Sequence, residues 1–140
     1  SPIELESRFE VYSEQYVLSI EVEAKLVIDM AKTLIYPAAV SYPSTLASTG
    51  TNMASIGVEL DQSTAKTVAA HANAMMEAVG KLSAAMEKED FSSTEEHMQF
   101  CAKEVRGLMN EVRSHADALE AEVADELWPL PKYQEMLFIK

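Results

Sequence analysis

The sequence of 140 residues predicts an all-α protein, an antiparallel bundle of three long helices. Apolar residues recur every three to four positions over three long segments, which is the period of an amphipathic helix. Only four glycines and five prolines are present, too few for a protein built from many short strands and turns. Long helices joined by turns bury their apolar stripes most easily against one another.

The first predicted helix covers about residues 3–42. Its apolar positions are Leu5, Phe9, Tyr12, Tyr16, Ile20, Val27, Ala31 and Leu34. Ser1 is suited to cap the helix, because Pro2 follows it and Glu4 stands three residues later. Between Leu26 and Tyr36 apolar residues cover almost every side, which is typical of a helix that is buried on more than one side. We expect this half to lie centrally in the bundle or to dock on another domain.

Two prolines interrupt the end of this helix. We expect Pro37 to kink the helix, and either this kink or the 43–57 connection could supply a fourth short element, which would make the three-helix bundle a four-helix bundle. Pro43 is expected to end the helix, because the residue before a proline is pushed toward extended geometry. Residues 43–57 are rich in Ser, Thr and Gly and are predicted to form a long connection, with either a short helical turn or a partner to order it.

The second and third predicted helices cover about residues 60–88 and 94–127. The apolar seam of the second is Ala65, Val68, Ala72, Met75, Val79, Leu82 and Met86. That of the third is Met98, Cys101, Val105, Leu108, Val112, His115, Leu119, Val123 and Leu127. Ser92 or Ser93 should cap the third helix, and the Trp128–Pro131 segment should end it. A short C-terminal helical turn is expected in the apolar tail at 133–138, which should pack on something.

Composition bounds the class of protein. The formal net charge of −12 disfavours nucleic acid and anionic membrane surfaces as partners. The lone cysteine excludes an intrachain disulfide, and no run of about 18 apolar residues suggests a membrane span, so a soluble, cytoplasmic protein is expected. Residues 1–140 read as a single domain, and a start at Ser1 rather than Met suggests a fragment cut from a longer protein.

The histidines are the first candidates for chemistry. His71 lies beside the seam of the second helix, as a phosphotransfer histidine would, but the lysine expected one turn later is missing. A solvated or half-buried histidine is the preferred interpretation. His115 lies on the seam of the third helix, where we expect a core histidine with a hydrogen-bond partner across the bundle.

Metal sites receive little support. His97 and Cys101 are four residues apart, a usable ligand spacing, but two ligands do not make a site, and a seam thiol usually behaves as a small hydrophobe. The residues three before the histidines are Val68, Thr94 and Val112, which excludes the usual Glu-x-x-His di-iron site. No glycine-rich phosphate loop, Gly-x-Ser-x-Gly or Cys-x-x-Cys motif occurs. The prediction is therefore no catalytic, cofactor-binding or metal site in this chain.

Two blocks of sequence resemble a known family. Glu14-Gln15-Tyr16, Ile20–Ala24 and Asp29–Ala38 resemble the C-terminal helical region of type III glutamine synthetases. The closing Ala124–Tyr133 segment, with Leu137 and Phe138, resembles that family's C-terminus, in the same order. The resemblance implies a parent ligase of nitrogen metabolism that joins ammonia to glutamate with ATP and a divalent metal such as Mg²⁺. It also implies a homo-oligomeric ring.

None of the family's ATP, glutamate or metal ligands maps onto a position here. The resemblance therefore implies a non-catalytic domain that packs on the catalytic domain of the same chain and on neighbouring subunits. The candidate interdomain contacts are Leu26, Ile28, Ile35, Tyr36, Trp128, Leu137 and Phe138. The alternatives are a stand-alone signalling or phosphotransfer-type four-helix bundle and a small metal-binding bundle.

Overall fold

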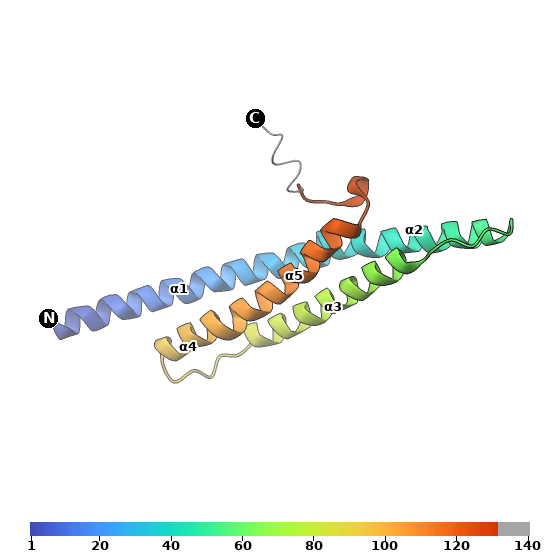
Figure 1. The fold of residues 1–140 in the computed structure, drawn as a ribbon. Helices are drawn as coiled ribbons and strands as arrows, with labels where there is room; N and C mark the ends of the chain where they lie inside the picture. Colours follow the sequence, from blue (N-terminus) through green and yellow to red (C-terminus); the bar gives the residue numbers. More distant parts are fainter. Residues whose placement is uncertain (132–140) are drawn as a thin grey trace, which may run out of the picture.

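The computed structural model describes residues 1–131, and all regular structure among them is helical (Figure 1). A first rod joins α1 (Pro2–Met30), the π-helical turn η1 (Ala31–Ile35) and α2 (Tyr36–Ala54). A second rod is α3 (Ser63–Met86). A third joins α4 (Thr94–Phe100), the π-helical turn η2 (Cys101–Val105) and α5 (Arg106–Glu122), and a 3₁₀ turn, η3 (Asp125–Leu127), follows. The predicted all-α fold of three helices is confirmed.

The three rods lie antiparallel in sequence order, so that α3 runs against both of its neighbours (Figure 1). The first rod, about 80 Å long at 1.5 Å per residue, is much longer than the other two. It projects beyond them at both ends, with the start of α1 at one end and α2 at the other (Figure 1). Beyond the bundle, α2 packs on α3, which leaves much of its surface open.

The caps expected from the sequence are present. The Ser1 hydroxyl accepts a hydrogen bond from the Glu4 backbone N–H at 3.4 Å, within a complete capping box. Ser93 caps α4 by accepting from the Glu96 backbone N–H at 3.1 Å. The predicted C-terminal turn at 133–138 lies outside the described residues.

The structure agrees with the prediction of a kink near Pro37 and differs from the prediction at Pro43. The kink lies in the π turn just before Pro37, where the Tyr36 N–H donates to the Ala31 carbonyl five residues back and the wider turn accommodates the ring. Pro43 does not end the helix, and the predicted connection at 43–57 is wrong, because α2 continues to Ala54. An internal proline removes one backbone hydrogen bond, and packing of α2 on α3 offsets that cost of about 3 kcal/mol.

The buried face of the first rod is also different from the predicted stripe. Its buried residues are small or branched: Ser13, Val17, Ile20, Ala24, Ala31, Ile35 and Ala39. Several large side chains assigned to the core are exposed instead, namely Leu5, Phe9, Tyr12 and Leu34. Alanines at Ala24, Ala31 and Ala39 are fully buried, which lets neighbouring helices approach closely. Several of the larger apolar side chains of this rod are therefore exposed, whereas Val17, Ile20 and Ile35 are buried.

The seams of the other two rods match the prediction more closely. Val68, Met75 and Leu82 of α3 are completely buried, and so are Val105 and Leu119 of the third rod. In α5 Met109 is buried in place of the predicted seam residue Leu108, which is only half-buried. The extra residue in the π turn η2 rotates the turn that follows it, so the predicted phase is off by one position there.

Two glycines inside helices give a direct test of this fold. A Cβ added at Gly80 of α3 or Gly107 of α5 would meet no atom within 4 Å. Alanine also costs less conformational entropy in a helix than glycine does. Gly80→Ala and Gly107→Ala should each raise the free energy of unfolding by about 0.5–1 kcal/mol, measured by urea denaturation.

The matched control is Gly57→Ala. Gly57 has a φ of +85°, a left-handed conformation that alanine adopts only with strain. This change should lower the free energy of unfolding. A destabilising Gly80→Ala or Gly107→Ala would contradict the helical assignment of those positions.

Candidate functional site

The two histidines His71 and His115 meet across the bundle. The Nδ1 atoms of His71 in α3 and His115 in α5 are 3.2 Å apart, a hydrogen bond between two half-buried rings. The expectation for His115, a partner across the bundle, is confirmed. The pair joins two helices through one ring nitrogen of each residue, which favours a structural role over that of an exposed phosphate acceptor.

The second histidine cluster is built around His97. Its ring stacks on Phe91 with centroids 4.2 Å apart, and its Nε2 lies 3.6 Å from the Glu21 carboxylate. Cys101, one turn later, is buried, and burial raises the pKa of its thiol, with the Glu21 carboxylate raising it further. His97 and Cys101 therefore take part in packing, and no group of three or more potential ligands is found within residues 1–131.

A salt bridge ties the first rod to the third. The Arg113 guanidinium of α5 donates to the Glu23 carboxylate of α1 at 2.7 Å. Both side chains are about half exposed, so the pair contributes no more than about 1 kcal/mol. The Glu23–Arg113 pair shows which side of α1 faces α5, and the opposite side of α1 is exposed.

The open side of α1 carries a row of apolar residues, which we call the outward face: Val11, Leu18, Val22 and Leu26. Intervals of seven, four and four residues place them on one side of the helix, about half a turn from the buried face. Leu18 is 61% exposed, Val22 60% and Leu26 56%. Contiguous apolar exposure of this kind is typical of surfaces that bind another protein, a membrane or a ligand.

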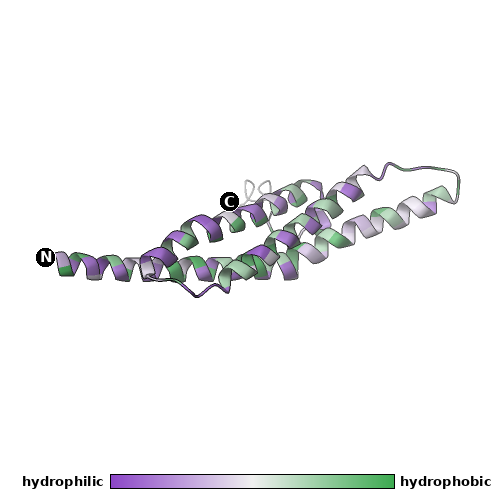
Figure 2. Cartoon of the chain, turned by 90° about the horizontal axis from the view of Figure 1, so that it is seen from below, coloured by the Kyte–Doolittle hydropathy of each residue, from purple (hydrophilic) through white to green (hydrophobic). Residues whose placement is uncertain are grey.

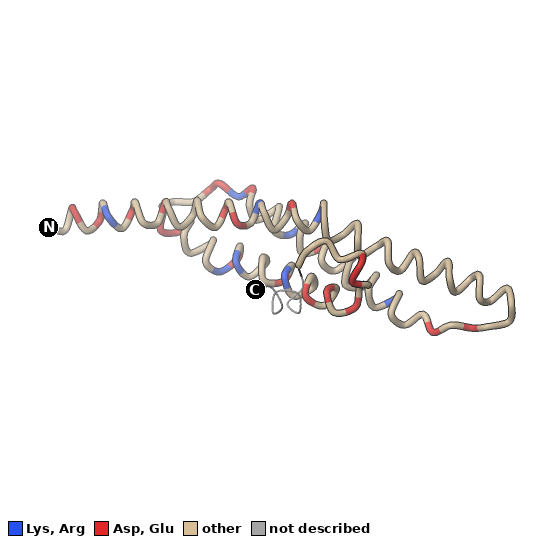
Figure 3. The backbone as a smooth tube through the Cα atoms, turned by 90° about the horizontal axis from the view of Figure 1, so that it is seen from above, with Lys and Arg blue, Asp and Glu red and all other residues tan. Residues whose placement is uncertain are grey.

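The other open surface is α2 with the loop that follows it and the start of α3, residues 36–69, which we call the arm. No Asp, Glu, Lys or Arg occurs from Thr33 to Val58, although charged residues make up 24% of the chain. Figure 3 shows this part of the rod free of charged residues, and Figure 2 shows pale and green colours dominating along α2. Depletion of charge is the compositional mark of an interface core.

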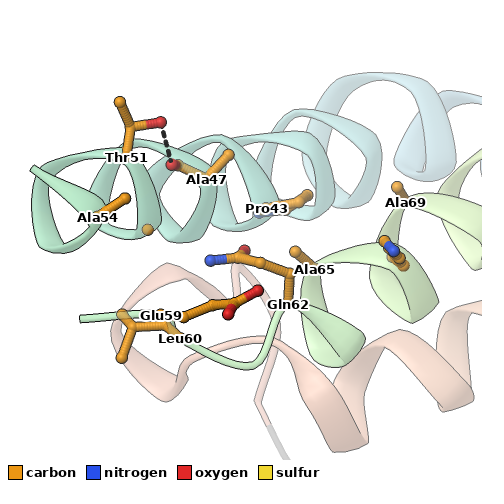
Figure 4. Close-up of a pocket in the computed structure, with 11 residues that line it drawn as sticks. Pro43, Ala47, Thr51, Ala54, Glu59, Leu60, Gln62, Ala65 and Ala69 are labelled. Atoms are coloured by element: carbon orange, nitrogen blue, oxygen red, sulfur yellow. Dashed lines mark hydrogen bonds between the residues drawn. The ribbon is translucent and has the colours of Figure 1, made fainter. Parts of the chain in front are cut away.

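An open groove of about 570 Å³ runs along the arm (Figure 4). Small side chains line both walls: Pro43, Ala47, Gly50 and Ala54 on α2, and Ala65 and Ala69 on α3. The Gln62 amide reaches across the groove and donates to the Leu46 carbonyl at 3.4 Å. Gln62 also occupies the space over Gly50, where an added Cβ would lie 2.1 Å from its Nε2. The groove is thus formed by residues that keep the two helices close.

Three predicted contact residues lie on or near the surface of the first rod. Leu26 belongs to the outward face, as described above. Ile28 and Tyr36 are half-buried, because each packs partly against the core. These three side chains remain candidates for interdomain contact.

Two further candidates are already covered by the chain itself. Ile35 and Trp128 are buried and belong to the core cluster, so little of either is left for a partner. Leu137 and Phe138 lie outside the described residues. Sequence reasoning missed Val11, Leu18 and Val22 of the outward face, because it gave that helix a single stripe. The signal was present as a second apolar row half a turn from the first.

Comparison with known proteins supplies the context. A family model described as the glutamine synthetase C-terminal domain matches residues 1–54, which cover the whole first rod. The chain is 36% identical over 149 residues to a type-3 glutamine synthetase of Dictyostelium discoideum, over 100% of this chain and 20% of that protein. It is 32% identical over 146 residues to a glutamine synthetase of Bacteroides fragilis (strain YCH46), over 98% of this chain and 20% of that protein. The chain thus spans about a fifth of the length of the curated relatives it matches.

The Cys101 environment gives a prediction that depends on pH. Alkylation requires the thiolate, and burial both shields Cys101 and raises the pKa of its thiol. In the unfolded chain the alkylation rate should rise about tenfold per pH unit up to pH 8. In the folded chain it should be far slower at every pH in that range, measured with iodoacetamide and mass spectrometry. Equal rates with and without urea would contradict the buried position.

Proposed function

We propose, from the premise that this chain belongs to the glutamine synthetase C-terminal domain family, that it is a packing and assembly domain without catalytic groups of its own. The parent enzyme would be the ATP-dependent ligase that joins ammonia to glutamate, with a divalent metal. In this proposal the outward face of α1 rests on the catalytic domain of the same chain, and other surfaces meet neighbouring subunits of a homo-oligomer.

The observation that carries the proposal is the outward face itself. The buried side of α1 carries Val17, Ile20 and Ala24, and the opposite side carries exposed leucines and valines, so the helix has two apolar sides and the bundle covers only one. Burial of a leucine or valine side chain contributes about 1.5–3 kcal/mol, so Leu18, Val22 and Leu26 together favour docking by several kcal/mol.

The charges beside the outward face indicate the kind of surface that it meets. Glu10 and Glu14 are exposed along one flank of the row. A partner surface with an apolar centre and a rim of lysine or arginine would complement both features. The contacts of the histidines within the chain support a structural role for them. His71 and His115 share a hydrogen bond, and His97 is stacked on Phe91.

The first prediction concerns ligand binding. If the ATP, glutamate and metal ligands of the parent lie elsewhere, isothermal titration of the 140-residue chain with ATP-Mg²⁺ or glutamate should show no binding at micromolar concentrations. Saturable heat with either ligand would refute the proposal that this domain lacks such a site.

The second prediction concerns docking. In the full-length enzyme, Leu18→Asp with Val22→Asp should weaken docking of this domain on the catalytic domain about 100-fold or more. The reason is that two charges would replace two aliphatic side chains that docking buries. Hydrogen–deuterium exchange along α1 should report the release as faster exchange. The matched control is Ala70→Asp with Ala121→Asp, which adds the same charge at exposed positions of α3 and α5. Equal exchange in both variants would remove the outward face from the interface.

A further inference from the structure

We propose that the arm of this chain pairs with the arm of a second copy across a two-fold axis, each copy placing Ile56 and Val58 in the other's groove. The inference gives the assembly part of the proposed function a specific contact. It concerns a different surface from the outward face of α1, so each can fail without the other.

The arm has the exposure that such a contact requires. It extends past the end of α5, and α2 packs on α3 (Figure 1). At its tip Ile56 is 71% exposed, and Val58 and Leu60 are exposed beside it. Ile56 lies in the turn at 55–57 and Val58 follows it directly, so the tip presents two exposed aliphatic side chains that water solvates poorly and that a groove lined by small residues can receive.

The groove and the protrusion lie on the same arm, which is what a two-fold contact needs. In such an interface one patch meets itself, so a protrusion and its groove must both be present on each copy. One wall of the groove carries Pro43, Ala47 and Gly50, the other carries Leu60 and Gln62, and the open groove gives room for branched side chains beside them (Figure 4). When two arms lie antiparallel and side by side, the tip of each falls beside the groove of the other.

Charge argues for a second copy of this chain as the occupant. Two copies of a chain with a net charge of −12 repel each other over most of their surface. Along Thr33–Val58 no charged residue opposes the approach. The groove rim carries the acid Glu59 and the base Lys66, and the exposed acid Asp61 lies beside Lys66. A two-fold pairing can bring Glu59 of one copy near Lys66 of the other, so the rim complements itself.

A partner of different chemistry fits this surface less well. A basic protein would gain nothing from the uncharged walls and would be drawn to the acidic flank of α1 instead. An anionic bilayer surface is disfavoured as well, because it would repel a chain with a net charge of −12.

The test is the oligomeric state of the 140-residue chain. Sedimentation equilibrium over a range of concentrations should show a monomer–dimer equilibrium. Ile56→Asp with Val58→Asp should lower the association constant at least tenfold, whereas Ile56→Leu should preserve it. Circular dichroism should be unchanged in all variants, because both side chains are exposed. Leu18→Asp on the outward face serves as the control and should leave the association constant as it is.

A second measurement locates the contact. In a sample that mixes isotope-labelled and unlabelled chains, intermolecular NOEs should connect the Ile56 methyl groups to the Ala47 and Ala65 methyl groups. A chain that stays monomeric at the highest concentration would overturn the proposal. So would a dimer that the Ile56→Asp and Val58→Asp changes leave intact, or one whose intermolecular NOEs come from α1. None of these results would bear on docking of the outward face to the catalytic domain.

Discussion

The structure depends on the close approach of the first rod to the two shorter rods. Alanines at Ala24, Ala31 and Ala39 lie completely buried on the inner side of that rod, where larger side chains would hold the helices apart. Val17, Ile20 and Ile35 fill the remaining inner positions, and the leucines and valines on the opposite side of α1 form the outward face. The placement of the small residues therefore decides both how the bundle packs and which side of the rod stays exposed.

Much of the fold follows from the sequence alone. The period of three to four residues was enough to identify the helices predicted at 60–88 and 94–127, which the structure gives as 63–86 and 94–122, so the third helix ends before its predicted end. The cap at Ser93 was predicted from its position before two glutamates. The buried face of the first rod could not be chosen in this way. Apolar residues occur on two sides of that helix, and only contact with the other rods shows which side is covered.

The arm was the hardest element to predict. Pro43 and the Ser, Thr and Gly residues that follow it up to Ala54 are typical of a loop, and local propensity gives no reason to expect a helix there. Packing on α3 overrides that propensity, and the π turn before Pro37 removes the clash that a proline ring makes in an ordinary turn. The groove could not be foreseen either, since it exists only once α2 and α3 lie together. The missing charges were visible in the sequence, but their meaning depended on the helix.

The unbroken first rod has a mechanical consequence. Backbone hydrogen bonding continues from α1 into α2 through η1, where the Tyr36 N–H reaches the Ala31 carbonyl. The outward face and α2, which forms one wall of the arm's groove, therefore lie on one continuous helical rod. A change in the direction of α1 therefore also changes the direction of α2, and the π turn at Ala31–Ile35 builds a bend into the rod between them.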